Sequence, residues 1–199
     1  SRVAALRPKA GPGGHGPGTE GRSHAEELTS LLGGRMERNG RGSHFRVRRR
    51  FAGPAAEPLS PGAWRRLSPG SAPPPCDPAE WIFLDTETTG LSGGTGTMPF
   101  MIGAGRFIAN EFVVEQFFVR DPAEEPAQLA ALSEFVEGVE GIVTYNGKSF
   151  DLPILNTRYI MQRLTNPFTA AAHFDLLHFT RRIWKSRLGQ CNLGNIETQ

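Results

Sequence analysis

Residues 81–90 read Trp-Ile-Phe-Leu-Asp-Thr-Glu-Thr-Thr-Gly, so an apolar run leads directly into two carboxylates. The apolar part is typical of a buried central strand. Because side chains two positions apart on a strand share a face, we expect Asp85 and Glu87 to point to the same side. Two such carboxylates repel each other unless a cation lies between them, and Mg²⁺ or Mn²⁺ prefer these oxygen ligands. The stretch therefore predicts a metal site at the carboxyl end of a strand, where open α/β sheets place their sites; a solvated strand end is the alternative.

A second strand end carries a further carboxylate. Residues 145–153 read Tyr-Asn-Gly-Lys-Ser-Phe-Asp-Leu-Pro, in which a short strand at 141–145 is followed by a polar turn. Asp151 then opens the next helix, whose first turn accommodates Pro153. Neighbouring strand ends lie only ~5 Å apart across a sheet, so Asp151 is expected near Asp85. The alternative is that Asp151 only caps its helix.

The region from residue 80 onward alternates strands and helices. We expect strands at 81–84, 100–108, 111–119 and 141–145, and helices at 122–136, 151–164 and 175–187. The second and third strands should form an antiparallel hairpin. The last helix should turn Leu176, Phe179, Ile183 and Trp184 inward. This order predicts an α/β fold with a mixed sheet.

The amino-terminal part has a different composition. Residues 1–79 contain 13 Lys and Arg against 6 Asp and Glu, a net charge of +7, whereas residues 80–199 carry a net charge of −5. We expect residues 1–24 to be disordered, residues 25–51 to form a small basic helix-turn and β-hairpin element, and residues 52–79 to be a Pro-rich linker. In the hairpin, Arg46, Arg48 and Arg50 share a face that either follows phosphates or protects an edge strand.

Together these motifs resemble a known family. Asp85-Thr-Glu87-Thr-Thr-Gly followed by Tyr145-Asn146-Gly-Lys-Ser-Phe-Asp151 is similar to the first two motifs of the DEDD 3′→5′ exonucleases of the ribonuclease H-like superfamily. Residues 91–97, 100–107 and 173–184 resemble, more narrowly, the YprB-like exonuclease-type domains of bacteria. The resemblance covers residues 80–199, and the hairpin at 31–51 is a candidate extension of it. It implies a ribonuclease H-like three-layer fold, with a mixed central sheet flanked by helices. The composition adds a basic, disordered amino-terminal arm before this fold.

The resemblance also implies a chemistry. Asp85, Glu87 and Asp151 would be catalytic and would hold two Mg²⁺ or Mn²⁺ ions, as in a two-metal phosphodiesterase. Thr88, Asn146 and Lys148 are then candidate substrate-binding residues. For Lys148 the alternative is a solvated turn position, and for Asn146 a role in fixing the turn.

One element of the family pattern is missing from residues 80–199. The family brings a fourth carboxylate, preceded by a Tyr or His general base, on a later helix, and the sequence stops at Gln199 before such a segment, so we expect a carboxyl-terminal truncation. Asp175 and His178 are candidates for a supporting role around the metal ligands. The structural alternative is that Asp175 caps its helix and His178 lies on the surface.

Other classes of protein are disfavoured by the composition. No stretch approaches the ~18 to 20 apolar residues that span a membrane, and the two cysteines suggest neither disulfides nor zinc, so we expect a cytoplasmic protein without a membrane partner. The leading hypothesis is a divalent-metal-dependent nuclease of 3′→5′ exonuclease type, with a single strand or 3′ end of DNA or RNA as partner. A non-catalytic nucleic-acid-binding ribonuclease H-like module is the alternative, and an interaction domain without a nucleic-acid role is a third hypothesis.

Overall fold

The computed structural model describes residues 24–52, 60, 62, 77–90, 96–189 and 191–194. Residues 1–23 of the predicted disordered arm, most of the predicted linker and the glycine-rich residues 91–95 lie outside the described residues. In chain order the elements are α1 (His24–Leu32), β1 (Arg35–Asn39), β2 (Gly42–Ala52), η2 (Pro78–Glu80), β3 (Trp81–Thr88), β4 (Pro99–Ile108), β5 (Glu111–Phe118), η3 (Pro122–Glu124), α3 (Glu125–Phe135), β6 (Gly141–Thr144), α4 (Asp151–Met161), β7 (Ala172–Asp175) and α5 (Leu176–Leu188).

The strands form one mixed sheet of seven strands in the order β1-β2-β5-β4-β3-β6-β7. The five strands from β1 to β3 pair antiparallel, and β3, β6 and β7 pair parallel. Strand β3 is therefore central, with an antiparallel neighbour on one side and a parallel neighbour on the other. The carboxyl ends of the three parallel strands meet at one edge of the sheet, which confirms the predicted mixed α/β architecture.

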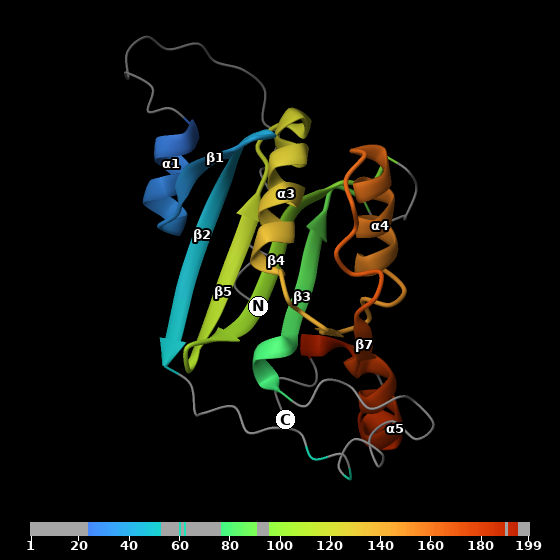
Figure 1. Ribbon diagram of the computed structural model, residues 1–199. Helices are drawn as coiled ribbons and strands as arrows, with labels where there is room; N and C mark the ends of the chain where they lie inside the picture. The colour runs from blue at the N-terminus through green and yellow to red at the C-terminus, as the bar shows by residue number, and fades with distance from the viewer. Residues whose placement is uncertain are drawn as a thin grey trace, which may run out of the picture.

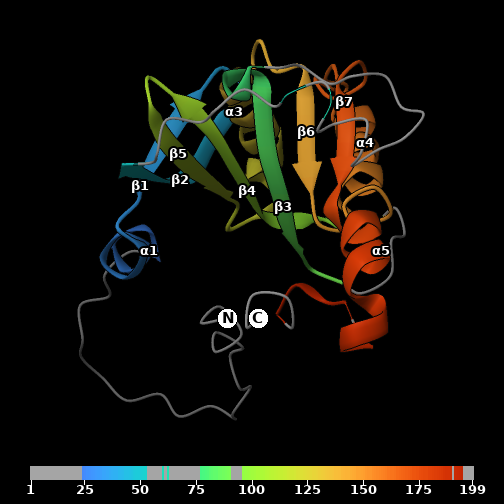
Figure 2. The same cartoon turned by 90° about the horizontal axis from the view of Figure 1, so that it is seen from below.

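Helices cover both faces of this sheet (Figure 1). Helices α3 and α4 lie on one face, and α5 lies on the opposite face beside β7, as Figure 2 shows from below. On the α5 face, Phe174 and Leu176 pack against the buried side chains of Trp81 and Val143. The layers of helix, sheet and helix confirm the predicted three-layer fold. None of the helices in the described part of the chain is long and apolar enough to cross a membrane.

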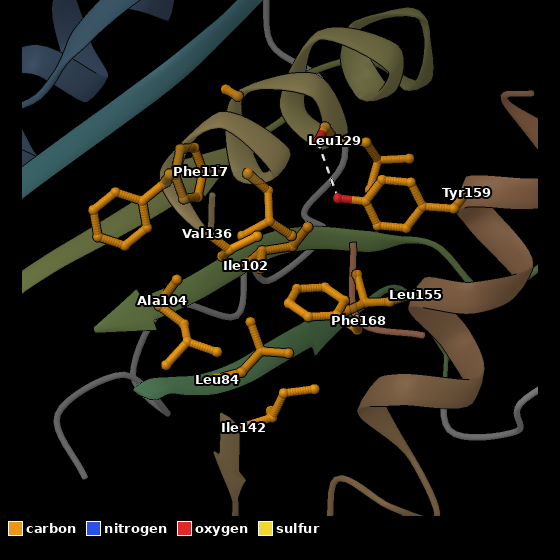
Figure 3. Packing of buried hydrophobic residues seen from close by; sticks show 14 of the residues in the cluster. Leu84, Ile102, Ala104, Phe117, Leu129, Val136, Ile142, Leu155, Tyr159 and Phe168 are labelled. Carbon is orange, nitrogen blue, oxygen red and sulfur yellow. Dashed lines mark hydrogen bonds between the residues drawn. The ribbon is translucent and has the colours of Figure 1, made fainter. Parts of the chain in front are cut away.

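The main hydrophobic core lies between the sheet and the pair α3 and α4 (Figure 3). Alternation on β3 turns Ile82 and Leu84 into this core, where both are at most 4% exposed. Helix α3 contributes Leu129, and α4 contributes Tyr159, whose hydroxyl donates a 3.0 Å hydrogen bond to the Leu129 carbonyl. This bond joins α3 to α4, and the packing of α4 on β3 positions the amino terminus of α4 beside the end of that strand.

The amino-terminal hairpin is part of the same sheet. Strand β2 pairs with β5 along eight residues, from Phe45 opposite Phe118 to Ala52 opposite Glu111. The interpretation of this strand as a protected edge is therefore wrong, because β1 is the edge and β2 lies inside the sheet. Local sequence shows the hairpin but contains no signal for a partner strand about 60 residues away.

All three hairpin arginines form ion pairs. Arg46 and Arg48 both form ion pairs with Glu115, which is fully buried in β5, and Arg46 also bonds Glu37 at 2.8 Å. The third, Arg50, pairs with Glu111 at the surface. This face is therefore occupied by internal ion pairs and does not present the free row of cations that phosphate tracking requires.

The carboxyl-terminal region differs from the prediction in two respects. Residues 172–175 form strand β7, whereas the sequence pattern predicted no strand there. Helix α5 begins directly after this strand, at Leu176. Ile183, predicted to turn inward, is exposed, and among the α5 side chains that the structure describes the buried ones are Leu177 and Thr180.

Candidate active site

The carboxylates of β3 lie where the strand extends beyond its parallel neighbour. The register pairs Trp81, Ile82 and Phe83 with β6, and the following residues have β4 on one side only. Asp85 and Glu87 alternate with the core-facing Leu84 and therefore share the opposite face, and both side chains are exposed. As predicted from their spacing, the two carboxylates lie on one side of the strand end.

The negative charge of Asp85 is unfavourable in this position. Although its side chain reaches solvent, the protein removes part of its hydration, and this desolvation favours the neutral acid. The negative charges of Asp151 and then Glu87 act in the same direction. Together these influences raise the pKa of Asp85 to about 6.

Asp151 approaches the same strand from the first residue of α4. The side chain is 6% exposed, and its Oδ1 accepts a 2.5 Å hydrogen bond from the Thr86 hydroxyl. Burial raises the pKa of Asp151, and the Thr86 bond offsets part of this change. Thr86 thus joins β3 to α4 on the face opposite Asp85. The sequence analysis did not predict this role for Thr86. The signal was available, because alternation along β3 turns the residue between Asp85 and Glu87 to the opposite face, toward the next helix.

The carboxylates have no basic partner in the described part of the chain. No Lys or Arg side chain there forms an ion pair with Asp85, Glu87 or Asp151. The same residues also contain no group of three or more His, Cys, Asp and Glu side chains close enough to hold a metal ion. The donor chemistry therefore suits a hard cation, but the three side chains are not drawn together into a complete coordination sphere.

The turn between β6 and α4 is tightly constructed. Asn146 has a positive φ of 68°, and the Gly147 amide donates a 3.1 Å hydrogen bond to the Thr144 hydroxyl. A Cβ atom on Gly147 would lie 2.5 Å from the Thr144 Cβ, so only glycine fits here without displacement. The turn therefore gives Asp151 a defined starting position.

Asp175, at the end of β7, clamps this turn. Its carboxylate accepts hydrogen bonds from the backbone amides of Asn146 (2.8 Å), Lys148 (3.0 Å) and Leu177 (3.0 Å). Burial alone would raise the pKa of Asp175, but the three amide donors outweigh it and hold the pKa below its usual value. The predicted helix cap is confirmed by the Leu177 bond, and the other two bonds give Asp175 a positioning role.

The remaining predicted residues differ in their surroundings. The Thr88 hydroxyl donates a 3.0 Å hydrogen bond to the Gly90 carbonyl, at a bulge between Glu87 and Thr88. Lys148 and His178 are exposed, and Asn146 is half-buried beside a cavity described below. The structure thus brings Asn146 and Lys148 to the same turn, whereas Thr88 is engaged within its own strand end.

A sheet of this topology, with carboxylates at the end of its central strand, defines a ribonuclease H-like protein. Comparison of sequences agrees, since a model of the RNase H superfamily matches residues 82–199. The chain belongs to the RNase H superfamily, whose members are often nucleases and bind nucleic acids. It is also 39% identical over 119 residues to the uncharacterized protein YprB of Bacillus subtilis (strain 168), which confirms the resemblance to YprB-like domains. The matched region is 59% of this chain and 29% of YprB, so the chain spans under a third of that relative.

Proposed function

We propose that the protein is a divalent-metal-dependent nuclease that hydrolyses phosphodiester bonds, acting as a 3′→5′ exonuclease on single-stranded nucleic acid. The observation that carries the proposal is the unneutralised carboxylate pair on β3, with Asp151 beside it. Desolvation, together with the negative charges of Asp151 and Glu87, raises the pKa of Asp85 to about 6, and a bound cation is strongly favoured in this electrostatic setting. Membership of the RNase H superfamily supports the same reading.

In this proposal Asp85, Glu87 and Asp151 hold two Mg²⁺ or Mn²⁺ ions. The bound ions would supply an activated water for in-line attack and would stabilise the leaving 3′ oxygen. The chain's contribution is to orient the ligands. Thr86 fixes the Asp151 carboxylate through its hydroxyl, and Asp175 fixes the turn that precedes Asp151. The open geometry requires the three carboxylates to close around the ions as these bind.

The substrate strand is proposed to cross this edge of the sheet. Lys148 presents a flexible cation to a phosphate, and Asn146 and Thr88 offer polar contacts nearby. Phe150 directly precedes Asp151 and is 54% exposed. An exposed aromatic ring stacks on an unpaired base with little sequence preference, which favours a single strand over a duplex.

The experiment is degradation of end-labelled single-stranded DNA and RNA in Mn²⁺, with the wild type beside the Asp85→Ala variant. We expect shortening from the 3′ end by the wild type and loss of most of it in the variant. Glu140→Ala removes an exposed carboxylate just before β6, at the opposite end of the strand, and should cleave as the wild type does. Equal cleavage by the wild type and Asp85→Ala would refute the proposal.

A non-catalytic nucleic-acid-binding module is the second candidate. It is favoured by the lack, among the described residues, of a side-chain group close enough to hold a metal. In this case oligonucleotide binding should be indifferent to EDTA and should weaken steeply with salt, without any cleavage in Mn²⁺.

A further inference from the structure

A second polar site lies next to the carboxylate edge, by which we mean the end of the sheet that carries Asp85, Glu87 and Asp151. A cavity of about 690 Å³ is lined by Tyr145 and Asn146, by one side of α5, and by residues 189 and 191–193. The Tyr145 hydroxyl donates a 2.7 Å hydrogen bond to the Cys191 carbonyl, which fixes the segment after α5 against the end of β6. Gly189 ends the helix with a positive φ of 67°, which turns the chain back to form this wall. The cavity is therefore framed by backbone that the fold holds in place.

Two cations line this cavity. Arg181 and Lys185 lie one helical turn apart on α5, and both side chains are exposed. Neither forms an ion pair with another residue in the described part of the chain, and α5 contains no Asp or Glu. Like charges four residues apart on a helix repel each other, so an anion between them is stabilised. The hairpin arginines that pair with Glu115 and Glu111 provide no such site.

The cavity wall also includes apolar side chains. Leu177 is 5% exposed and Leu193 is 45% exposed, so one part of the wall is buried and one part is accessible. A pocket of several hundred Å³ with a few polar groups and an apolar surface has the size of a small-ligand site. Its chemistry suits a nucleotide, with the phosphate at the cations and the sugar or base at the leucines.

Contacts already described connect this cavity to the carboxylates. Asn146 belongs both to the cavity wall and to the turn that Asp175 clamps, and Asp151 follows in the same turn five residues later. A nucleic-acid strand that reaches Asp151 therefore has a cationic pocket beside it, across the turn formed by residues 145–150.

We propose that this cavity binds a phosphate-bearing nucleotide of a nucleic-acid strand through Arg181 and Lys185, at a position next to the nucleotide that is cleaved. The inference rests on the proposed nuclease function and adds a substrate-binding site to it. Cations at this pocket compensate the negative potential of the carboxylate edge, which would otherwise repel the strand.

The test measures binding of a fluorescein-labelled single-stranded oligonucleotide by anisotropy in EDTA. We expect Arg181→Ala with Lys185→Ala to weaken binding at least tenfold, and to lower the slope of log affinity against log salt by about 1.4, the loss of two single-strand phosphate contacts. The matched control is Arg38→Ala with Arg41→Ala, which removes two exposed charges from the distant hairpin and should change affinity less than twofold. Unchanged affinity in the pocket variant, or equal loss in both, overturns the proposal.

Two further measurements separate this inference from the proposed function and from misfolding. Arg181→Lys with Lys185→Arg keeps both charges and should retain affinity within a few fold; loss equal to that of the alanine pair would overturn a phosphate role. In Mn²⁺, the alanine pair should raise KM while leaving kcat unchanged, since both cations lie outside the reacting centre. If binding depends on Arg181 and Lys185 but the wild type cleaves nothing, the proposed nuclease function is refuted and the proposed nucleotide site is supported.

Discussion

Asp85 and Asp175 show how the same side chain acquires opposite properties at one edge of a sheet. Asp85 is partly desolvated and lies near the negative charges of Asp151 and Glu87, so its pKa rises to about 6. Asp175 is 7% exposed, and its burial alone would raise its pKa, yet three backbone amides donate to it and lower its pKa. Hydrogen bonds to the charged form thus distinguish the stabilised anion, Asp175, from the destabilised anion, Asp85. Asp85 is the proposed metal ligand, and Asp175 positions the turn.

The raised pKa of Asp85 predicts a pH-dependent cost in the metal-free protein. Between about pH 4 and pH 6 the folded state holds a proton that the unfolded state releases, so stability falls as the pH rises through this window and stays reduced above it. Asp85→Asn removes this cost. In EDTA, we expect its unfolding free energy to exceed that of the wild type by about 1 kcal/mol at pH 7.5, since solvent screening reduces the effect at this exposed side chain, and to match it near pH 4.

Urea unfolding at the two pH values measures this difference. Glu140→Gln, which neutralises an exposed carboxylate away from the site, is the control and should show the same stability as the wild type at both. A gain in Asp85→Asn that is equal at pH 4 and pH 7.5 would contradict the electrostatic account.

At the scale of elements, α3 and α4 are joined by a buried ion pair. Glu125, the first residue of α3, is fully buried and accepts hydrogen bonds from Arg158 Nε at 2.5 Å and Arg158 Nη2 at 2.6 Å. Gln162 donates to the same carboxylate. Because α4 begins with Asp151, this contact fixes the helix that carries a proposed ligand.

Breaking this pair from one side should be severe. Arg158→Leu leaves the Glu125 charge buried without its partner, and we expect a loss of about 3–5 kcal/mol in unfolding free energy. Replacing both residues, Glu125→Met with Arg158→Leu, should cost less than Arg158→Leu alone, because no charge then stays buried. A double variant whose loss equals the sum of the two single losses, measured by urea unfolding, would show that the pair is not coupled.

The elements differ in how far the sequence predicts them. The apolar run ending at Asp85 and the turn before Asp151 predict their strand and helix ends, since alternation and capping act locally. Strand β7 was missed because residues 172–175 run directly into α5 without a turn signal. Thr86 was missed because its role depends on the side chain of Asp151, 65 residues later. The partner of the hairpin arginines, Glu115, is likewise visible only once β2 pairs with β5.

At the scale of the whole molecule, the amino-terminal hairpin completes the sheet. Strand β2 covers β5 along eight residues, and Arg46 and Arg48 neutralise the buried Glu115. Our sequence-based boundaries put this hairpin and residues 80–199 in separate segments. The structure places both in one sheet, so we expect the two to fold as one unit.

Removal of residues 1–52 tests this dependence. The shortened chain would leave a buried carboxylate unpaired and β5 as a new edge strand, so we expect aggregation or loss of cooperative unfolding. Circular dichroism and size-exclusion chromatography of the shortened and full chains measure the effect. A monomeric shortened chain with the stability of the full chain would show that residues 80–199 are an independent domain.

The central claim is that the carboxylates at the end of β3 hold divalent ions, and Mn²⁺ binding followed by electron paramagnetic resonance tests it most directly. Loss of the free Mn²⁺ signal reports bound ions without requiring any substrate or turnover. The account predicts up to two bound ions in the wild type, weakened at least tenfold in Asp85→Asn and in Asp151→Asn, and unchanged in Glu140→Gln. Mn²⁺ binding that is absent in the wild type, or equal in all four proteins, would contradict it.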